Sequence, residues 1–80
     1  MHLEIITPEK KIFEGDVTIV TFPGADGSFQ VMNDHAPLVS LLKDGAVVYK
    51  SKDSTEEVMI TGGVVEVLKN KVIVLADGVA

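Results

Sequence analysis

Short apolar runs alternate with clusters of turn-forming residues along the whole chain, and this alternation limits the folds that it can adopt. No stretch keeps apolar residues at helical spacing for more than two turns, whereas Val, Ile and Leu recur in runs of strand length. Branched residues of this kind favour a pleated surface. The gaps between the runs are rich in Gly, Pro, Asn and Asp, which favour turns. The pattern predicts an all-β fold, a flattened β-sandwich of about eight to ten short, mostly antiparallel strands.

Two local signals define where we expect strands to end or bend. Lys43-Asp44-Gly45 predicts a hairpin turn, because Asp-Gly is a strong signal for a tight turn between strands. Gly62-Gly63 predicts a bulge or a close backbone approach, because no side chain is present there to pack. Residues 64–68 and 72–76 are expected to form the last hairpin of the chain.

Length and charge exclude several classes of protein. Eighty residues predict a single domain over residues 1–80. The absence of cysteine excludes disulfides and thiolate metal sites, and the net charge of −5 argues against a nucleic-acid partner. The longest apolar run, residues 72–76, is far shorter than the roughly 20 residues that span a bilayer. We therefore expect a soluble protein that reaches a membrane only through another protein.

The segment from Gly27 to Leu42 is the most informative part of the chain. A glycine turn leads into a short alternating strand, which breaks at Asn33-Asp34 and resumes after His35 and Pro37. Asn and Asp favour turns, and proline fixes its own φ and extends the residue before it. The segment predicts a stiff, polar-edged corner that carries one of the two histidines, which makes it a candidate site.

Catalysis and metal binding are not expected at this corner. His35 and Asp34 are adjacent, so on an extended chain their side chains point in opposite directions, and no activated Ser or Cys motif lies nearby. His2 is far from His35 in sequence, without the carboxylate spacing of a closed metal site. Residues 24–27 lack the helix and Lys-Ser/Thr of a phosphate-binding loop. We expect no catalytic residue, metal or cofactor; a histidine bonded to a backbone carbonyl is the simpler interpretation of His35.

Three segments, in order, carry a resemblance to a known family. They are the opening residues 3–13, the stretch from the glycine turn through His35-Ala36-Pro37-Leu38, and Gly62-Gly63 with the strand pair that follows it. Together they resemble the epsilon subunit of the F-type ATP synthase, which is called delta in mitochondria. Gln30 stands where that family commonly has glycine, and Asn33-Asp34 stands where it has Pro-Gly.

The resemblance implies a non-catalytic subunit of the central stalk, or rotor, that binds the gamma subunit and contacts the c-ring, coupling proton flow to ATP synthesis. It implies a peripheral location on the cytoplasmic side of the plasma membrane, in a bacterium. The implied gamma contacts are Thr7, His35, Ala36, Pro37, Leu38 and Ser40. The implied c-ring contacts are Ala25, Asp26, Gly27 and Ser28. The helical hairpin that follows this domain in fuller members is absent from residues 1–80.

Other functions remain open from the residues alone. A biotinyl or lipoyl carrier domain is also a small acidic β-sandwich, but it needs a lysine at a hairpin tip flanked by Met or by Asp and Ala. Lys43, Lys52, Lys69 and Lys71 lack those neighbours. The residues are also compatible with a small β-sandwich binding module or with a small enzyme built around His35. Exposed positions among Val20, Phe22, Leu38, Leu41 and Leu42 would favour a protein-binding surface.

Overall fold

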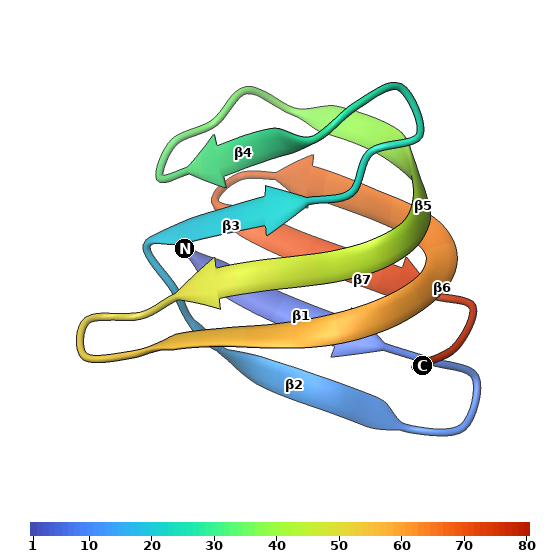
Figure 1. The fold of residues 1–80 in the computed structure, drawn as a ribbon. Helices are drawn as coiled ribbons and strands as arrows, with labels where there is room; N and C mark the ends of the chain where they lie inside the picture. The colour runs from blue at the N-terminus through green and yellow to red at the C-terminus, as the bar shows by residue number, and fades with distance from the viewer.

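The computed structural model describes residues 1–80 and contains strands and turns but no helix, so it has no helix that could cross a membrane. Its seven strands form one hydrogen-bonded sheet in the order β2-β1-β7-β6-β5-β3-β4 (Figure 1). The strands are β1 (His2–Ile6), β2 (Lys11–Asp16), β3 (Ile19–Phe22), β4 (Phe29–Met32), β5 (Leu38–Lys50), β6 (Thr55–Leu68) and β7 (Lys71–Ala76). Every neighbouring pair is antiparallel except the parallel pair β1–β7. The predicted all-β class and mostly antiparallel pairing are confirmed.

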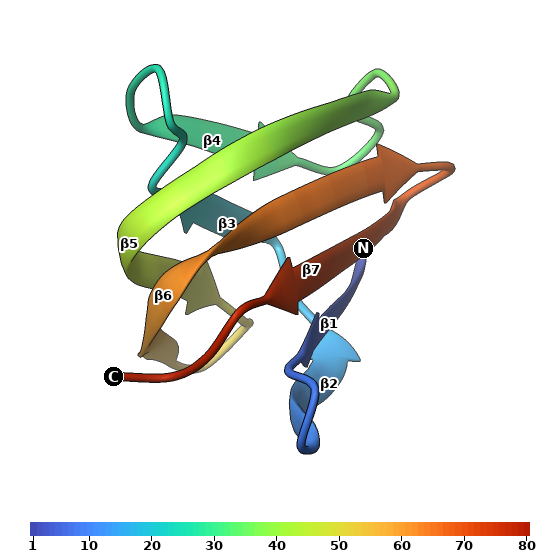
Figure 2. The ribbon, with the colours of Figure 1, turned by 90° about the vertical axis from the view of Figure 1, so that its right-hand side faces the viewer.

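The sheet folds into two layers because β5 and β6 bend together (Figure 1). One layer contains β2, β1, β7, the second half of β6 and the first half of β5; the other contains the remaining halves of β5 and β6 with β3 and β4. We call these the first and second layers; Figure 2 shows the first layer in front. The molecule measures 26 × 25 × 18 Å along its principal axes, which fits a flattened sandwich.

The strand count is lower than expected because the predicted hairpin at Asp44-Gly45 does not exist. β5 continues through these residues, with Asp44 paired to Thr61 and Gly45 paired to Ile60. At the bend β5 and β6 are unpaired for one position, Lys43 on β5 and Gly62 on β6, and each of these residues bonds another part of the backbone. The Lys43 N–H donates to the carbonyl oxygen of Pro23 at 2.9 Å, and the carbonyl of Gly62 accepts from the Asp77 N–H at 3.1 Å. The turn-forming residues thus bend a paired strand instead of ending it, giving seven strands where eight to ten were expected.

The expectation of a close backbone approach at Gly62-Gly63 is confirmed. Both residues have positive φ, 80° and 144°. A Cβ atom added to Gly63 would lie 2.3 Å from the carbonyl oxygen of Leu75 on β7, a distance that no side chain tolerates. Glycine therefore allows β6 to turn between layers while it stays paired with β7.

Alternation along each strand sends one set of side chains into the space between the layers. Fifteen buried apolar residues form this core: Leu3, Ile5, Val17, Val20, Phe22, Val31, Leu42, Val47, Tyr49, Ile60, Val65, Val67, Val72, Val74 and Ala76. Aromatic pairs add contacts between strands, with ring centroids 4.3 Å apart for Phe13 and Tyr49 and 5.4 Å apart for Phe22 and Phe29. The expected last hairpin is confirmed, and its two turn residues, Lys69 and Asn70, both have positive φ, as such turns require.

Candidate interaction surfaces

The predicted corner is the exposed loop between β4 and β5, and two other segments hold it in place. The backbone N–H of Asp34, which has a φ of 64°, donates to Oδ1 of Asn70 at 2.9 Å. The N-terminal ammonium of Met1 donates to Oδ1 of Asn33 at 2.8 Å. The loop therefore connects to the start of the chain and to the β6–β7 turn, and its shape is fixed by contacts from outside the loop.

His35 is half-buried in this loop, and its ring bonds the backbone. Its Nδ1 lies 2.7 Å from the carbonyl oxygen of Ala36. A carbonyl oxygen only accepts hydrogen bonds, so Nδ1 carries the proton, and Nε2 is left without a partner in this chain. This contact agrees with the simpler interpretation of His35 drawn from the sequence, a histidine bonded to a backbone carbonyl. Ala36 and Pro37 are exposed next to it, while Leu38 packs partly against the core.

Two of the residues implied by the resemblance as gamma contacts lie away from His35 or point inward. Thr7 follows the far end of β1 and is 7% exposed. Its hydroxyl donates to the carbonyl oxygen of Lys10 at 3.0 Å and accepts from the Lys10 N–H at 3.2 Å, so it holds the β1–β2 turn. Ser40 is half-buried on β5, with its hydroxyl 3.3 Å from the carbonyl oxygen of Leu41. Both hydroxyls are satisfied within the chain.

The segment implied as a c-ring contact forms an exposed turn at the other end of β4 from the corner (Figure 1). Ala25, Asp26, Gly27 and Ser28 are all exposed. The Gly27 N–H donates to the carbonyl oxygen of Gly24 at 3.0 Å, and the Ala25 N–H donates to the carbonyl oxygen of Leu41 at 2.9 Å. The turn is thus anchored to β5, and Asp26 takes part in none of the ion pairs of the chain.

An apolar surface, which sequence reasoning did not locate, covers the outside of the first layer on β1, β7, β6 and β5. In the register of these strands Ile6 lies beside Leu75, Leu75 beside Val64, and Val64 beside Leu41. The next row outward along the strands contains Glu4, Ile73, Glu66 and Val39 in the same order. We call these two rows the outer apolar face. Val39, Leu41 and Leu75 are 70%, 68% and 51% exposed, so nothing in the chain covers them.

The corner and the outer apolar face are continuous. Pro37 and Leu38 line one shallow hollow together with Val39, Glu66 and Leu68. Val39 and Glu66 also line a second hollow that runs to Ile6 and Leu75. Of the apolar positions singled out in the sequence, Leu41 is exposed here, whereas Val20, Phe22 and Leu42 belong to the core. The sequence signal that could have located this face is the period-two spacing of a strand, which sets residues 39 and 41 on one side of the sheet and residues 64 and 66 on the same side.

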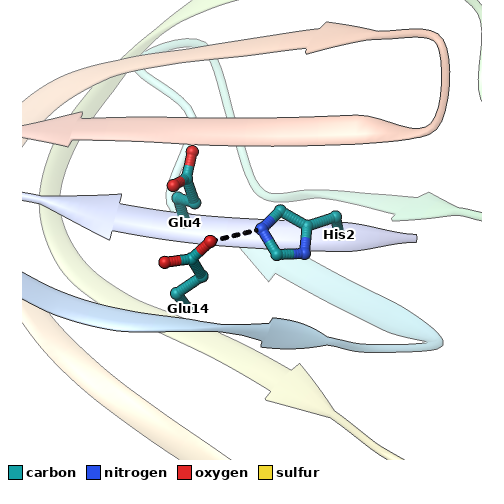
Figure 3. Close-up of side chains that lie close together, drawn as sticks. All are labelled: His2, Glu4 and Glu14. Atoms are coloured by element: carbon teal, nitrogen blue, oxygen red, sulfur yellow. Dashed lines mark hydrogen bonds and ion pairs between the residues drawn. The ribbon is translucent and has the colours of Figure 1, made fainter.

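Beyond the apolar rows, the same side of the sheet carries a network of charged side chains on β1 and β2 (Figure 3). Nε2 of His2 lies 2.9 Å from Oε2 of Glu14. The Lys11 ammonium donates to carboxylate oxygens of both Glu4 and Glu14. Hydrogen bonding to Lys11, and then to His2, lowers the pKa of the Glu14 carboxyl, and the same bonds to Glu14 and Glu4 raise the pKa of Lys11.

His2, Glu4 and Glu14 offer ligand atoms within 4.8 Å of one another, a grouping that sequence reasoning did not expect. It arises because the β1–β2 register sets Glu4 directly opposite Glu14. The Lys11 ammonium already bonds both carboxylates, so it supplies the positive charge that two adjacent carboxylates need. Both carboxylates therefore already have a cationic partner, and the grouping is an ion-pair network within the chain.

The fold and these surfaces define a small β-sandwich domain with an open apolar face and exposed loops at both ends. Residues 1–80 match the family model described as "ATP synthase, Delta/Epsilon chain, beta-sandwich domain" over their whole length, and the chain belongs to this family.

Relatives named ATP synthase epsilon chain include one from Campylobacter fetus, 51% identical over 79 residues, and one from Chlorobium limicola, 47% identical over 79 residues. The alignments cover 98% of this chain in both cases, but 61% of the first relative and 90% of the second. The chain thus spans about three fifths of the length of the Campylobacter relative.

Two solved structures share the fold at low sequence identity. One is described as the central stalk and c-ring of the Tetrahymena thermophila mitochondrial ATP synthase, with a TM-score of 0.85, 20% identity, and coverage of 100% of this chain and 65% of the other. The other comes from a Euglena gracilis mitochondrial ATP synthase structure with OSCP, F1 and c-ring, with a TM-score of 0.90, 18% identity, and coverage of 98% and 51%. At these identities the likeness supports the β-sandwich fold.

Proposed function

We propose that this domain is part of a non-catalytic rotor subunit of an F-type ATP synthase, which binds the gamma subunit and contacts the c-ring. The complex would place it peripherally on the cytoplasmic side of a bacterial plasma membrane. Family membership and relatives named ATP synthase epsilon chain support the assignment. So does the fold shared with a chain from a structure described as central stalk and c-ring. The domain itself would transmit torque, and neither a metal nor a cofactor enters this role.

The outer apolar face is the observation that carries the proposal. Soluble monomers rarely expose large contiguous apolar patches unless a partner covers them. Here Val39, Leu41 and Leu75 are each more than half exposed in neighbouring rows of the sheet. The face adjoins the corner at Pro37, so a gamma subunit seated on both would cover one continuous surface. Thr7 and Ser40 would then stabilise the backbone next to this surface, because their hydroxyls bond backbone groups of the same chain.

The c-ring contact is proposed for the Asp26 turn at the other end of β4. The family resemblance implies that this turn faces polar loops of the ring that carry an arginine. Asp26 is exposed and forms no ion pair within the chain, so its carboxylate is available to a basic neighbour. Because the corner and this turn lie at opposite ends of the four-residue strand β4, one rigid body would hold both partners at a fixed spacing.

The test is a calorimetric titration of the domain with the gamma subunit of the same ATP synthase. Leu41→Asp puts a charge into the outer apolar face, and Met59→Asp puts the same charge on an exposed apolar residue of the second layer. We expect Leu41→Asp to weaken binding at least about 30-fold, as for a central interface residue. Met59→Asp should change affinity less than about twofold, and both variants should melt within a few degrees of wild type. Absence of wild-type binding, or equal effects of the two variants, would contradict the proposal.

A further inference from the structure

Glu66 is the one ionisable residue among the apolar side chains at the middle of the outer apolar face. Its direct neighbours across the strands are Ile73 on β7 and Val39 on β5. It lines both hollows of the face, in one case with Leu68 and in the other with Leu75. The side chain is exposed, so its carboxylate is hydrated as long as nothing covers the face.

No cation of this chain pairs with Glu66. The four ion pairs all lie in the β1–β2 network and involve His2 or Lys11. Lys71 stands one row away on β7, opposite Leu68, and forms no ion pair either. Glu4 occupies the same row as Glu66 but is bound by the Lys11 ammonium at 3.2 Å. Of the two carboxylates in the rows of the outer apolar face, only Glu66 is therefore left for an external partner.

An unpaired carboxylate at this position restricts what can cover the face. Burying a charge without a partner is strongly unfavourable, because the carboxylate loses its hydration and gains no compensating ion pair or hydrogen bond. A surface that docks on Val39, Leu41 and Leu75 must therefore supply a cationic donor at Glu66. We infer that the partner presents an apolar patch with one Lys or Arg side chain, which pairs with Glu66 and sets the specificity of docking.

This inference rests on the proposed function, since it takes the gamma subunit as the occupant of the face. A second copy of the domain is disfavoured by the same chemistry. A two-fold contact through the face would bring two Glu66 carboxylates towards each other, and each copy also carries a net charge of −5. Charge complementarity therefore favours a different, basic partner over self-association.

The test compares Glu66→Gln with Glu57→Gln in titrations against the gamma subunit at low and high salt. Glu57 is a matched control, because it is an exposed glutamate on the same strand, in the second layer, without an ion pair. We expect Glu66→Gln to weaken binding at least about tenfold and to reduce the salt dependence of the affinity. Glu57→Gln should stay within about twofold of wild type. Glu66→Lys should abolish binding, and replacing the Lys or Arg of gamma that pairs with Glu66 by an acidic residue should restore it.

The outcomes distinguish the role of Glu66 from the proposed function of the domain. If wild type binds gamma and Glu66→Gln binds equally well, the role of Glu66 is overturned while the proposed function stands. If wild type does not bind gamma, both fall. If the free domain forms a dimer that Leu41→Asp dissociates and Glu66→Gln tightens, the face is a self-association surface and the inference is wrong. Thermal melting of each variant confirms that binding is compared between folded proteins.

Discussion

The backbone N–H of Asp34 donates a hydrogen bond to the side-chain oxygen of Asn70 at 2.9 Å, across 36 positions of the sequence. This bond joins the β4–β5 loop to the β6–β7 turn. The loop carries His35 and Pro37, so one side-chain amide from a distant turn orients the corner proposed to meet the gamma subunit. A surface held in this way loses little conformational freedom on binding, which favours affinity.

Replacing Asn70 with glycine should release the corner without disturbing the turn. Asn70 has a φ of 62°, which glycine adopts at no steric cost, so Asn70→Gly removes mainly the bond to Asp34. We expect the free energy of unfolding to fall by about 1 kcal/mol and the amides of residues 33–36 to exchange faster with solvent. Lys69→Gly is the control in the same turn, where a φ of 50° and no bond to the corner predict equal or greater stability. Unchanged exchange in Asn70→Gly would show that the loop is held by other contacts.

Gly63→Ala should be among the most damaging substitutions in the chain. The new Cβ atom would lie 2.3 Å from the carbonyl oxygen of Leu75, which belongs to a paired strand and cannot move aside easily. We expect a loss of at least about 2 kcal/mol in the free energy of unfolding.

Gly27→Ala separates the clash from the backbone strain. Gly27 has a φ of 134°, close to the 144° of Gly63, but a Cβ there meets nothing within 4 Å. Denaturant unfolding should show the smaller loss for Gly27→Ala. Equal losses would mean that the positive φ, rather than contact with β7, makes Gly63 necessary.

The β1–β2 network predicts a pH dependence of stability. Because hydrogen bonding to Lys11 lowers the pKa of Glu14 in the folded protein, the network stabilises the fold above the unfolded carboxyl pKa. That contribution is lost as the pH falls below about 4. Lys11→Met should raise the pKa of Glu14, measured by NMR titration of its side-chain carboxyl carbon. The stability difference from wild type should shrink in acid.

Lys71→Met is the control for that titration, because Lys71 is exposed and takes part in none of the ion pairs. It should leave the pKa of Glu14 unchanged. If Lys11→Met also leaves it unchanged, the ion pair between Lys11 and Glu14 does not persist in solution.

Pro37→Asp should weaken gamma binding more than it weakens folding. Pro37 is exposed at the border between the corner and the outer apolar face, so the added charge would be desolvated only in the complex. We expect at least a tenfold loss of affinity with about 1 kcal/mol or less of lost stability. Ser54→Asp, in the exposed β5–β6 turn, should bind like wild type. Equal affinity of Pro37→Asp and wild type would exclude this border from the interface.

The sequence predicts the strands well because burial follows their alternation. Leu3 and Ile5 point inward and Glu4 and Ile6 outward, as period-two spacing requires. The prediction fails at Asp44-Gly45, where local turn preference suggests a hairpin. The residues stay paired with Thr61 and Ile60, and both strands bend together, a long-range arrangement that local preference does not encode.

The candidate surfaces could be predicted only in part. Turn chemistry at Asn33-Asp34 and Pro37 indicates an exposed corner, and the structure has one. Alternation indicates that Val39 and Leu41 share a face but not whether another layer covers it. The grouping of His2 with Glu4 and Glu14 depends on the register of β1 against β2, which spacing along the chain does not determine.

Hydrogen-exchange mass spectrometry of the domain, free and bound to the gamma subunit, locates the docking surface without mutation, so it shows whether gamma covers the corner and the outer apolar face. We expect slower exchange on binding in residues 35–41, 64–66 and 73–75, with no change in residues 55–59 of the second layer. Protection confined to the second layer, or no protection on mixing, would contradict this expectation.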